Sequence, residues 1–300
     1  MSNKWKNISF DRWTPQTEHS WPYRVFGQYE DELMRLIISY ESAESFAYGR
    51  LKNEGAKWES AAKDFGLRRS DNTQTIRQWS DNYNKLGNWF RLGLLLSLNS
   101  YFETYLSAII KECIDSDPGL LFGLSHEIDG VLMLKGQQKL KKNEIANKIK
   151  NCTKGTWSQR VANMTNLFGP LPQFSGHVVS RLDKLRIIRN KVGHAFGRDI
   201  SKAQKYYEVT SQEMQKLSIE SFNKYHLMIT HLVQDLDTYL MSHHIGNYEP
   251  LFHYHMICTQ FGSLNKGEKM VRLKKSLGQD KNVFYSKDFC RGVVLHYEQL

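Results

Sequence analysis

The sequence contains few of the residues that interrupt helices or cross-link chains. Only six prolines occur in 300 residues, so long uninterrupted helices are permitted. The four cysteines are scattered and form no C-x-x-C pair, which indicates reduced thiols and argues against a disulfide framework or a cysteine zinc site. The chain shows no signal-peptide pattern, and its longest apolar segment, residues 92–98, is much too short to cross a bilayer. We therefore expect a cytoplasmic protein with no membrane segment.

Several motifs of known chemistry are also missing. No phosphate-binding loop, dinucleotide fingerprint, H-E-x-x-H or G-x-S-x-G is present, and no strand alternation or internal repeat is visible. Four histidines flank a predicted turn at 246–250, namely His243, His244, His253 and His255. They could converge as metal ligands, but their spacing fits no zinc motif. We expect no metal and no cofactor.

Apolar residues at three- and four-residue spacing predict an all-α protein, an up-and-down helical bundle with helical extensions at both ends. Residues 86–115 give the strongest helical pattern. The first 28 residues are expected to be irregular, and Thr210 to Glu213 form a predicted capping box that opens a last long helix. The other predicted helices begin at Glu30 or cover residues 120–134, 143–152, 158–168 and 174–195, with short ones in 251–300.

Composition and breaks divide the chain into three predicted segments. Residues 1–85 form an N-terminal helical extension, residues 86–245 the bundle, and residues 246–300 a basic C-terminal helical extension, with Gly246 and Pro250 breaking the chain between the last two.

The most informative stretch lies at the end of the helix predicted over 174–195. Its apolar residues form a stripe suited to a core: Val178, Leu182, Leu185, Ile188 and Val192. Arg189, Asn190 and His194 interrupt the other side. A permanent cation, an amide and an imidazole that exchanges protons near neutral pH form a set suited to phosphate chemistry.

The spacing Arg189-Asn190-x-x-x-His194 resembles the R-x4-H motif of HEPN domains (higher eukaryotes and prokaryotes nucleotide-binding). The long helix over 86–115, the insert, the motif helix and the final long helix follow the order of a HEPN bundle. A second match, Arg291 to His296, has glycine after the arginine and lies at the end of the chain, so we regard it as a decoy.

The resemblance implies a metal-independent endoribonuclease in which the RNA 2′-hydroxyl attacks the adjacent phosphate. His194 would then serve as general base or acid, Arg189 would stabilise phosphorane charge, and Asn190 would orient either group. Glu103 and Lys191 are candidate accessory residues. The resemblance also implies a homodimer with the motif at its interface, and a toxin or antiphage role with a cognate antitoxin or sensor protein.

The formal charge of +10 favours a polyanionic partner such as RNA. Residues 266–291 contain eight basic and three acidic residues, and residues 181–191 contain five basic and one acidic. Candidate RNA-binding residues are therefore Arg186, Arg198, Lys269, Arg272, Lys274 and Lys275.

Other interpretations remain open. Arg189 and His194 could simply cap the carbonyls at a helix end. Glu103 and Asn99 are four residues apart and fit a solvated or interhelical polar pair as well as an active-site role. At the level of function, the alternatives are a catalytically inactive HEPN-like module that binds nucleic acid or a protein, and a DNA-binding regulator that uses the basic tail.

Overall fold

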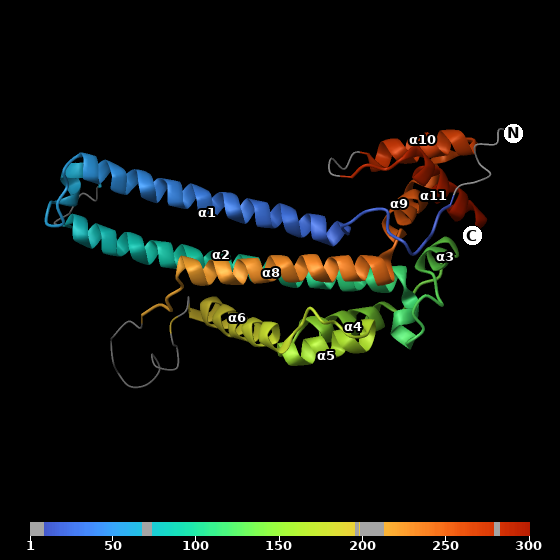
Figure 1. Ribbon diagram of the computed structural model, residues 1–300, viewed down its shortest axis with the longest axis horizontal. Helices are drawn as coiled ribbons and strands as arrows, with labels where there is room; N and C mark the ends of the chain where they lie inside the picture. Colours follow the sequence, from blue (N-terminus) through green and yellow to red (C-terminus); the bar gives the residue numbers. More distant parts are fainter. Residues whose placement is uncertain (1–8, 68–73, 196–197, 199–212, 279–282) are drawn as a thin grey trace. The chain divides into compact units, whose positions relative to one another are not determined.

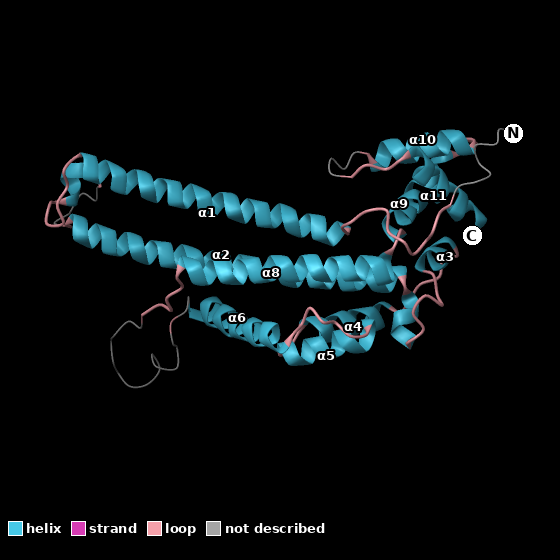
Figure 2. Cartoon of the chain, viewed as in Figure 1, coloured by secondary structure: helices cyan, strands magenta, loops and turns pink. Residues whose placement is uncertain are grey.

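The computed structural model describes residues 9–67, 74–195, 198, 213–278 and 283–300. Within these ranges the predicted all-α fold is confirmed, since no strand occurs and a single isolated bridge joins Ala61 and Thr75 (Figure 2). None of the described helices has an apolar stretch of the length that a bilayer crossing requires. The helices and helical turns are α1 (Trp21–Asn53), η2 (Ala62–Phe65), α2 (Ile76–Ser116), η3 (Pro118–Phe122), α3 (Gly130–Lys135), α4 (Lys142–Thr153), α5 (Trp157–Phe168), α6 (Gly176–Ala195), α8 (Ile219–Leu240), η4 (Met241–Ile245), α9 (Tyr248–Cys258), η5 (Thr259–Phe261), α10 (Lys266–Leu277) and α11 (Lys287–Gln299).

The chain groups into two compact units. Unit 1 comprises residues 1–25, 103–179 and 231–300, and unit 2 comprises residues 26–102 and 180–230. This grouping differs from the three consecutive segments expected from the sequence, because the unit boundaries fall inside α1, α2, α6 and α8.

Unit 2 is built on an antiparallel hairpin of α1 and α2 (Figure 1). Aromatic pairs fix its register: Tyr29 stacks on Tyr101 with ring centroids 4.8 Å apart, and Tyr48 packs edge-on against Trp79 at 5.5 Å. Residues nearer the end of α1 therefore pair with residues nearer the start of α2, as antiparallel helices require. Stacked and edge-on rings contribute beyond their buried area, so these pairs determine how the two helices align.

The far end of the hairpin is closed by a small hydrophobic cluster. Buried Leu51, Ala62 and Ile76 form its centre, with Phe65 and Trp79 packed against them. The bridge between Ala61 and Thr75 holds the connecting segment in place. Through this cluster, the segment that connects α1 to α2 buries apolar side chains of its own.

Helix α8 contributes to unit 2 through its first half. Glu30 of α1 accepts a 2.7 Å hydrogen bond from His226 and a further one from Thr230. Arg181 of α6 donates to the carbonyl of Lys224 at 3.1 Å and lies over the ring of Tyr225. These contacts attach α8 to α1 and to the motif helix.

Unit 1 is held together by Arg12, whose side chain is only 5% exposed. Its guanidinium lies 3.2 Å from Asp129 and 2.7 Å from both the Ile245 carbonyl and the Ser116 hydroxyl. A buried arginine must have such partners, because an uncompensated buried charge is strongly destabilising. One side chain therefore joins the N-terminal segment, the end of α2, the start of α3 and the turn after α8.

A pair of enclosed carboxyl groups lies elsewhere in unit 1. Glu249 of α9 is 1% exposed, lies 2.9 Å from Arg24, and accepts the backbone N–H of Trp21. The carboxyl group of Glu112 on α2 is close enough for each of the two groups to affect the pKa of the other. Burial raises the pKa of Glu249 to about 7, against the lowering effect of its hydrogen bonds and of Arg24. Burial and the neighbouring Glu249 raise the pKa of Glu112 well above its usual value.

Several predicted helix starts are wrong because polar caps were missed. Helix α1 begins at Trp21 rather than Glu30, since Ser20 accepts the backbone N–H of Tyr23. Helix α2 begins at Ile76 rather than 86, where Thr75 and Gln78 bond reciprocally as a capping box.

Three further expectations are corrected. Residues 213–218 are not helical, and α8 begins after Ser218, which accepts the N–H of Ser221; residues 210–212 of the predicted capping box lie outside the described residues. The single helix expected over 120–134 is instead η3, a turn and α3, because Gly123 adopts φ 70. Pro250 does not break the chain but occupies the first turn of α9, where its missing N–H costs nothing.

Candidate functional site

Helix α6 presents its apolar side to the core as predicted. Leu182 and Leu185 are fully buried and Val192 is 3% exposed, while Ile188 and Val178 are partly buried. The three-to-four spacing of these residues places them along one stripe of the helix. The apolar stripe therefore fixes which side of α6 remains accessible.

The motif residues lie on the accessible side of the last turns of α6. Arg189, Lys191 and His194 are exposed, and Asn190 is half-buried. The Arg189 guanidinium donates to the Asn190 side-chain oxygen over 3.2 Å. Because Asn190 and His194 are one helical turn apart, their side chains project from the same face. The Asn190 amide and the His194 imidazole thus share one face of α6, and the Arg189 guanidinium reaches Asn190 from the edge of the apolar stripe.

The neighbouring basic residues differ in their surroundings. Arg186 is half-buried and pairs with Asp183 at 2.9 Å, so part of its charge is already compensated. Arg198 lies exposed just beyond the helix.

Glu103 has a structural partner in unit 1. Its carboxylate lies 3.2 Å from the guanidinium of Arg160 on α5, which is 5% exposed and lies over the ring of Trp157. The structure therefore places Glu103 in an interhelical ion pair, the non-catalytic alternative considered for it.

The basic residues proposed for the tail lie within α10. Met270, Leu273 and Leu277 are buried on one side of α10, and Lys269 is paired with Glu298 at 2.7 Å. Arg272 and Lys275 are exposed, whereas Lys274 lies 5.0 Å from the ring of Phe284. The charge open to a polyanion is therefore smaller than the sequence count suggests.

The four histidines considered as ligands do not form one group. His253 bonds to Ser276 and His255 to Tyr297, while His243 bonds to the carbonyl of Tyr239. The residues of the decoy motif have structural contacts. Arg291 pairs with Asp288, and His296 packs on Phe10.

His244 instead lies beside Asp117 and His126. Sequence reasoning missed this group, because the three residues come from separate segments and have no motif spacing.

Comparison of the chain with models of protein families, with curated proteins and with solved structures finds no significant match. The resemblance to HEPN domains therefore rests on the motif residues and on the order of helices predicted from the sequence alone.

Chemically, the exposed set on α6 suits a reaction at a phosphodiester. An arginine keeps its charge and can bind two oxygens of a phosphate at once. An imidazole can take or supply a proton near neutral pH.

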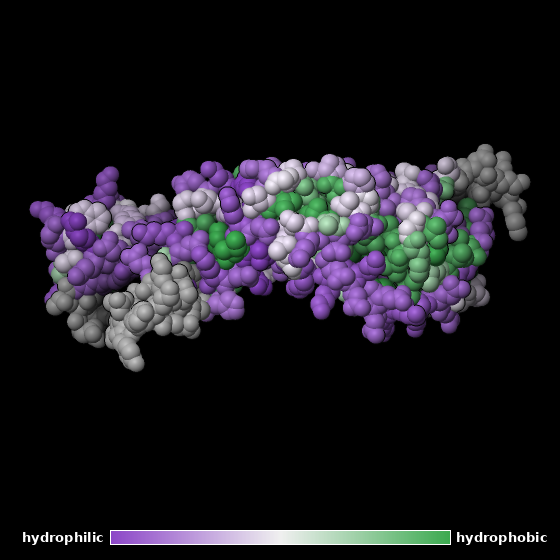
Figure 3. Space-filling model, turned by 90° about the horizontal axis from the view of Figure 1, so that it is seen from below, coloured by the Kyte–Doolittle hydropathy of each residue, from purple (hydrophilic) through white to green (hydrophobic). Residues whose placement is uncertain are grey.

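The face of the molecule seen in Figure 3 is mostly hydrophilic, with separate hydrophobic patches.

Proposed function

We propose that this chain is a metal-independent endoribonuclease of the HEPN type. The observation that carries the proposal is that the side chains of Arg189 and His194 are exposed on the last turns of α6 and that of Asn190 is half-buried, while the apolar stripe of the helix is buried. The residues that would touch RNA are thus distinct from those that hold the helix in place.

In the proposed reaction the 2′-hydroxyl of RNA attacks the adjacent phosphorus, and the bond to the 5′-oxygen of the next nucleotide breaks. His194 removes the proton from the 2′-hydroxyl or delivers one to the departing 5′-oxygen. Arg189 donates to the phosphorane oxygens, where negative charge accumulates. The products carry a 2′,3′-cyclic phosphate and a 5′-hydroxyl.

Asn190 has a positioning role in this scheme. Its side-chain oxygen already accepts a hydrogen bond from Arg189 over 3.2 Å, which limits the orientations of the guanidinium. Its NH₂ group remains able to donate to a phosphate oxygen. Lys191, exposed beside it, adds positive charge that favours RNA binding.

The proposal includes a homodimer with α6 at its interface. One copy of the motif supplies one histidine, whereas transesterification uses both a base and an acid. Ile187, next to the motif on α6, is 48% exposed, and burying it against a second copy would be favourable. A toxin or antiphage role, with an antitoxin or sensor protein as partner, belongs to the same proposal and rests on the resemblance alone.

The test is incubation of the purified protein with RNA in EDTA, beside the same sequence carrying a single 2′-deoxy nucleotide at the cleavage site. We expect cleavage of the first and none at the substituted position of the second, with products ending in cyclic phosphate. Products with 3′-hydroxyl ends would contradict the mechanism. Binding of RNA without cleavage would favour the inactive interaction module, and preferential binding of duplex DNA would favour the regulator.

A further inference from the structure

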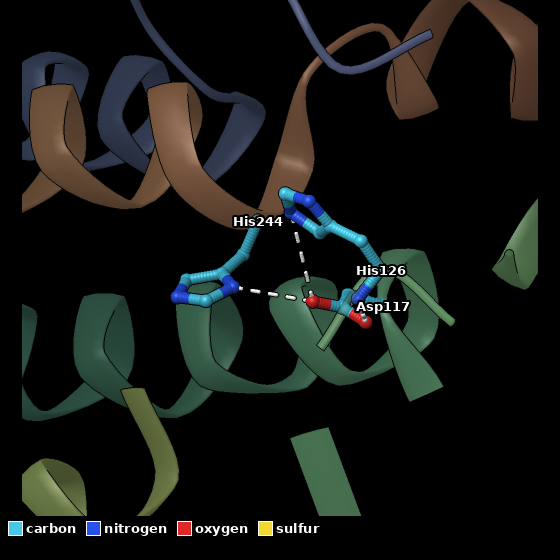
Figure 4. A group of neighbouring side chains, drawn as sticks. All are labelled: Asp117, His126 and His244. Atoms are coloured by element: carbon cyan, nitrogen blue, oxygen red, sulfur yellow. Dashed lines mark hydrogen bonds and ion pairs between the residues drawn. The ribbon is translucent and has the colours of Figure 1, made fainter. Parts of the chain in front are cut away.

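Three side chains of unit 1 converge at the end of α2 (Figure 4). Asp117 directly follows α2, His126 lies in the turn between η3 and α3, and His244 belongs to the π-helical turn η4. Asp117 Oδ2 lies 3.2 Å from His244 Nδ1 and 3.9 Å from His126 Nε2. One nitrogen or oxygen from each residue lies within 4.8 Å of those of the other two.

The charge of Asp117 requires compensation at this point. Its side chain is fully buried, and among the described residues its ion pairs are those with His126 and His244. Arg12, the buried cation of the same unit, is paired with Asp129 instead. A buried carboxylate is costly without compensation, so a positive ion beside Asp117 would be favourable.

The carboxylate is held in place by hydrogen bonds to both of its oxygens, and the Ser125 hydroxyl also lies 3.5 Å from His244 Nδ1. The backbone N–H of His126 donates to Asp117 Oδ1 at 2.9 Å, and the Ser125 hydroxyl donates to Oδ2 at 2.6 Å. Such supporting hydrogen bonds orient the carboxylate ligands of metal sites. The ring of His126 is itself fixed by stacking on Trp13 at 4.0 Å.

The backbone is unusual at both histidines. His126 has φ 66, a left-handed conformation that is uncommon outside glycine, and His244 lies in a π-helical turn. Both features are concentrated at functional sites. His244 is 6% exposed, and its Nε2 has no hydrogen-bond partner within the described part of the chain. Its Nδ1 faces Asp117 Oδ2 at 3.2 Å, so if an ion is bound through Nδ1, the proton of the neutral imidazole would lie on Nε2.

We propose that Asp117, His126 and His244 form a binding site for a divalent transition-metal ion, for which Zn²⁺ has the best-matched ligand set. Two imidazoles and a carboxylate are established zinc ligands, and bond lengths of about 2.0–2.1 Å place tetrahedral ligands roughly 3.3 Å apart. The separations of 3.2 and 3.9 Å are close to that value.

His126 would bind the ion through Nε2 as the neutral imidazole. At present this nitrogen donates to the His243 carbonyl over 2.6 Å. In the complex its proton moves to Nδ1 and the carbonyl oxygen becomes free. Since His126 is 43% exposed, water can occupy a remaining position on the ion. The ion would join the end of α2 to η4 and so stabilise unit 1, independently of the motif on α6.

Zinc binding by the metal-stripped full-length protein tests the proposal, with no RNA present. We expect one Zn²⁺ per chain by calorimetry and a melting temperature that rises with zinc concentration. His126→Asn should weaken zinc binding at least about tenfold. Loss of a group that only hydrogen-bonds to a metal ligand already has an effect of about this size, and in the proposal His126 is itself a ligand. Asparagine tolerates positive φ, so this variant should remain folded. The matched control is His243→Ala, which removes a neighbouring exposed imidazole but keeps the backbone carbonyl and should bind zinc like the parent.

Equal zinc binding by the parent and His126→Asn would overturn the proposal, as would the absence of a binding isotherm at micromolar zinc. Loss of binding in His243→Ala with retention in His126→Asn would place the ion on surface histidines and would also overturn it. None of these outcomes affects the proposed nuclease, whose test is RNA cleavage in EDTA.

Discussion

Glu112 and Glu249 are two enclosed carboxyl groups from different helices of unit 1, and each affects the pKa of the other. Arg24 lies 2.9 Å from Glu249 and also lowers the pKa of Glu112. Two carboxyls in contact cannot both ionise without repulsion, so the pair retains a proton at a pH where the unfolded chain has lost it.

The free energy of unfolding should therefore fall as the pH rises through the interval between the unfolded pKa near 4.5 and the pKa of Glu249, about 7. The folded state binds more protons than the unfolded state across this interval, which gives stability a negative slope with pH. Glu112→Gln, which mimics the protonated form, should flatten this slope and raise stability above pH 7. Chemical denaturation from pH 5 to 8 measures it. Glu41→Gln, at an exposed position on α1, should keep the parental slope.

His194→Ala and Arg189→Ala should each abolish cleavage while leaving the fold intact. Loss of a proton-transfer group costs on the order of 10²–10⁴ in rate, and loss of a charge-stabilising donor about 10²–10³. Both side chains are exposed, so melting temperatures should stay near that of the parent. His177→Ala, which removes another exposed imidazole of α6, is the matched control. A folded His194→Ala variant that cleaves at the parental rate would refute the assignment.

Glu103→Gln should affect stability and not cleavage. It weakens the ion pair with the buried Arg160 guanidinium, and hydrogen bonds to charged groups contribute about 1.5–3 kcal/mol. A lower denaturation midpoint with a cleavage rate within about twofold of the parent is expected. A loss of rate comparable to that of His194→Ala would restore Glu103 as an accessory catalytic residue.

In light scattering the protein should have a mass near twice 35.1 kDa at micromolar concentration. Ile187→Glu should shift the mass toward the monomer and lower cleavage at low protein concentration, because the charge opposes burial of this position. Ile38→Glu changes a similarly exposed isoleucine on α1 and should leave the mass unchanged. A parent that is monomeric at these concentrations would contradict the dimer.

Replacing Arg272 and Lys275 by glutamine should weaken RNA binding and reduce its dependence on salt. Each phosphate contact to single-stranded RNA contributes roughly 0.7 to the slope of log affinity against log salt. Both residues are exposed on α10, opposite its buried side, so folding should be unaffected. Substitution of Lys269, already paired with Glu298, should change the slope less. An unchanged slope in the double variant would mean that the tail does not contact RNA.

Apolar periodicity was enough to predict the helices and their core-facing residues. Leu182, Leu185 and Val192 on α6 are buried as predicted, because burial follows directly from the period of the pattern. Helix starts were predicted poorly where a polar residue precedes aromatic or charged ones, as at Ser20 and Thr75. Such caps contribute only about 1 kcal/mol each, so they leave a weak trace in the sequence.

The motif could be found from local spacing, since all its residues lie within two turns of one helix. The group of Asp117, His126 and His244 could not, because it depends on a π-helical turn and a left-handed residue that no pattern predicted. The role of Arg12 was missed for the same reason, as its partners come from distant parts of the chain.

The hydrogen bond between Arg12 and the Ile245 carbonyl also determines when unit 1 can finish folding during translation. Arg12 is made early, yet the Ile245 carbonyl that it binds follows 233 residues later. At a translation rate of about 5–20 residues per second, Ile245 is synthesised on the order of 10–50 s after Arg12. Unit 1 therefore gains this contact only after η4 has been synthesised, and a nascent chain interrupted before residue 245 lacks it.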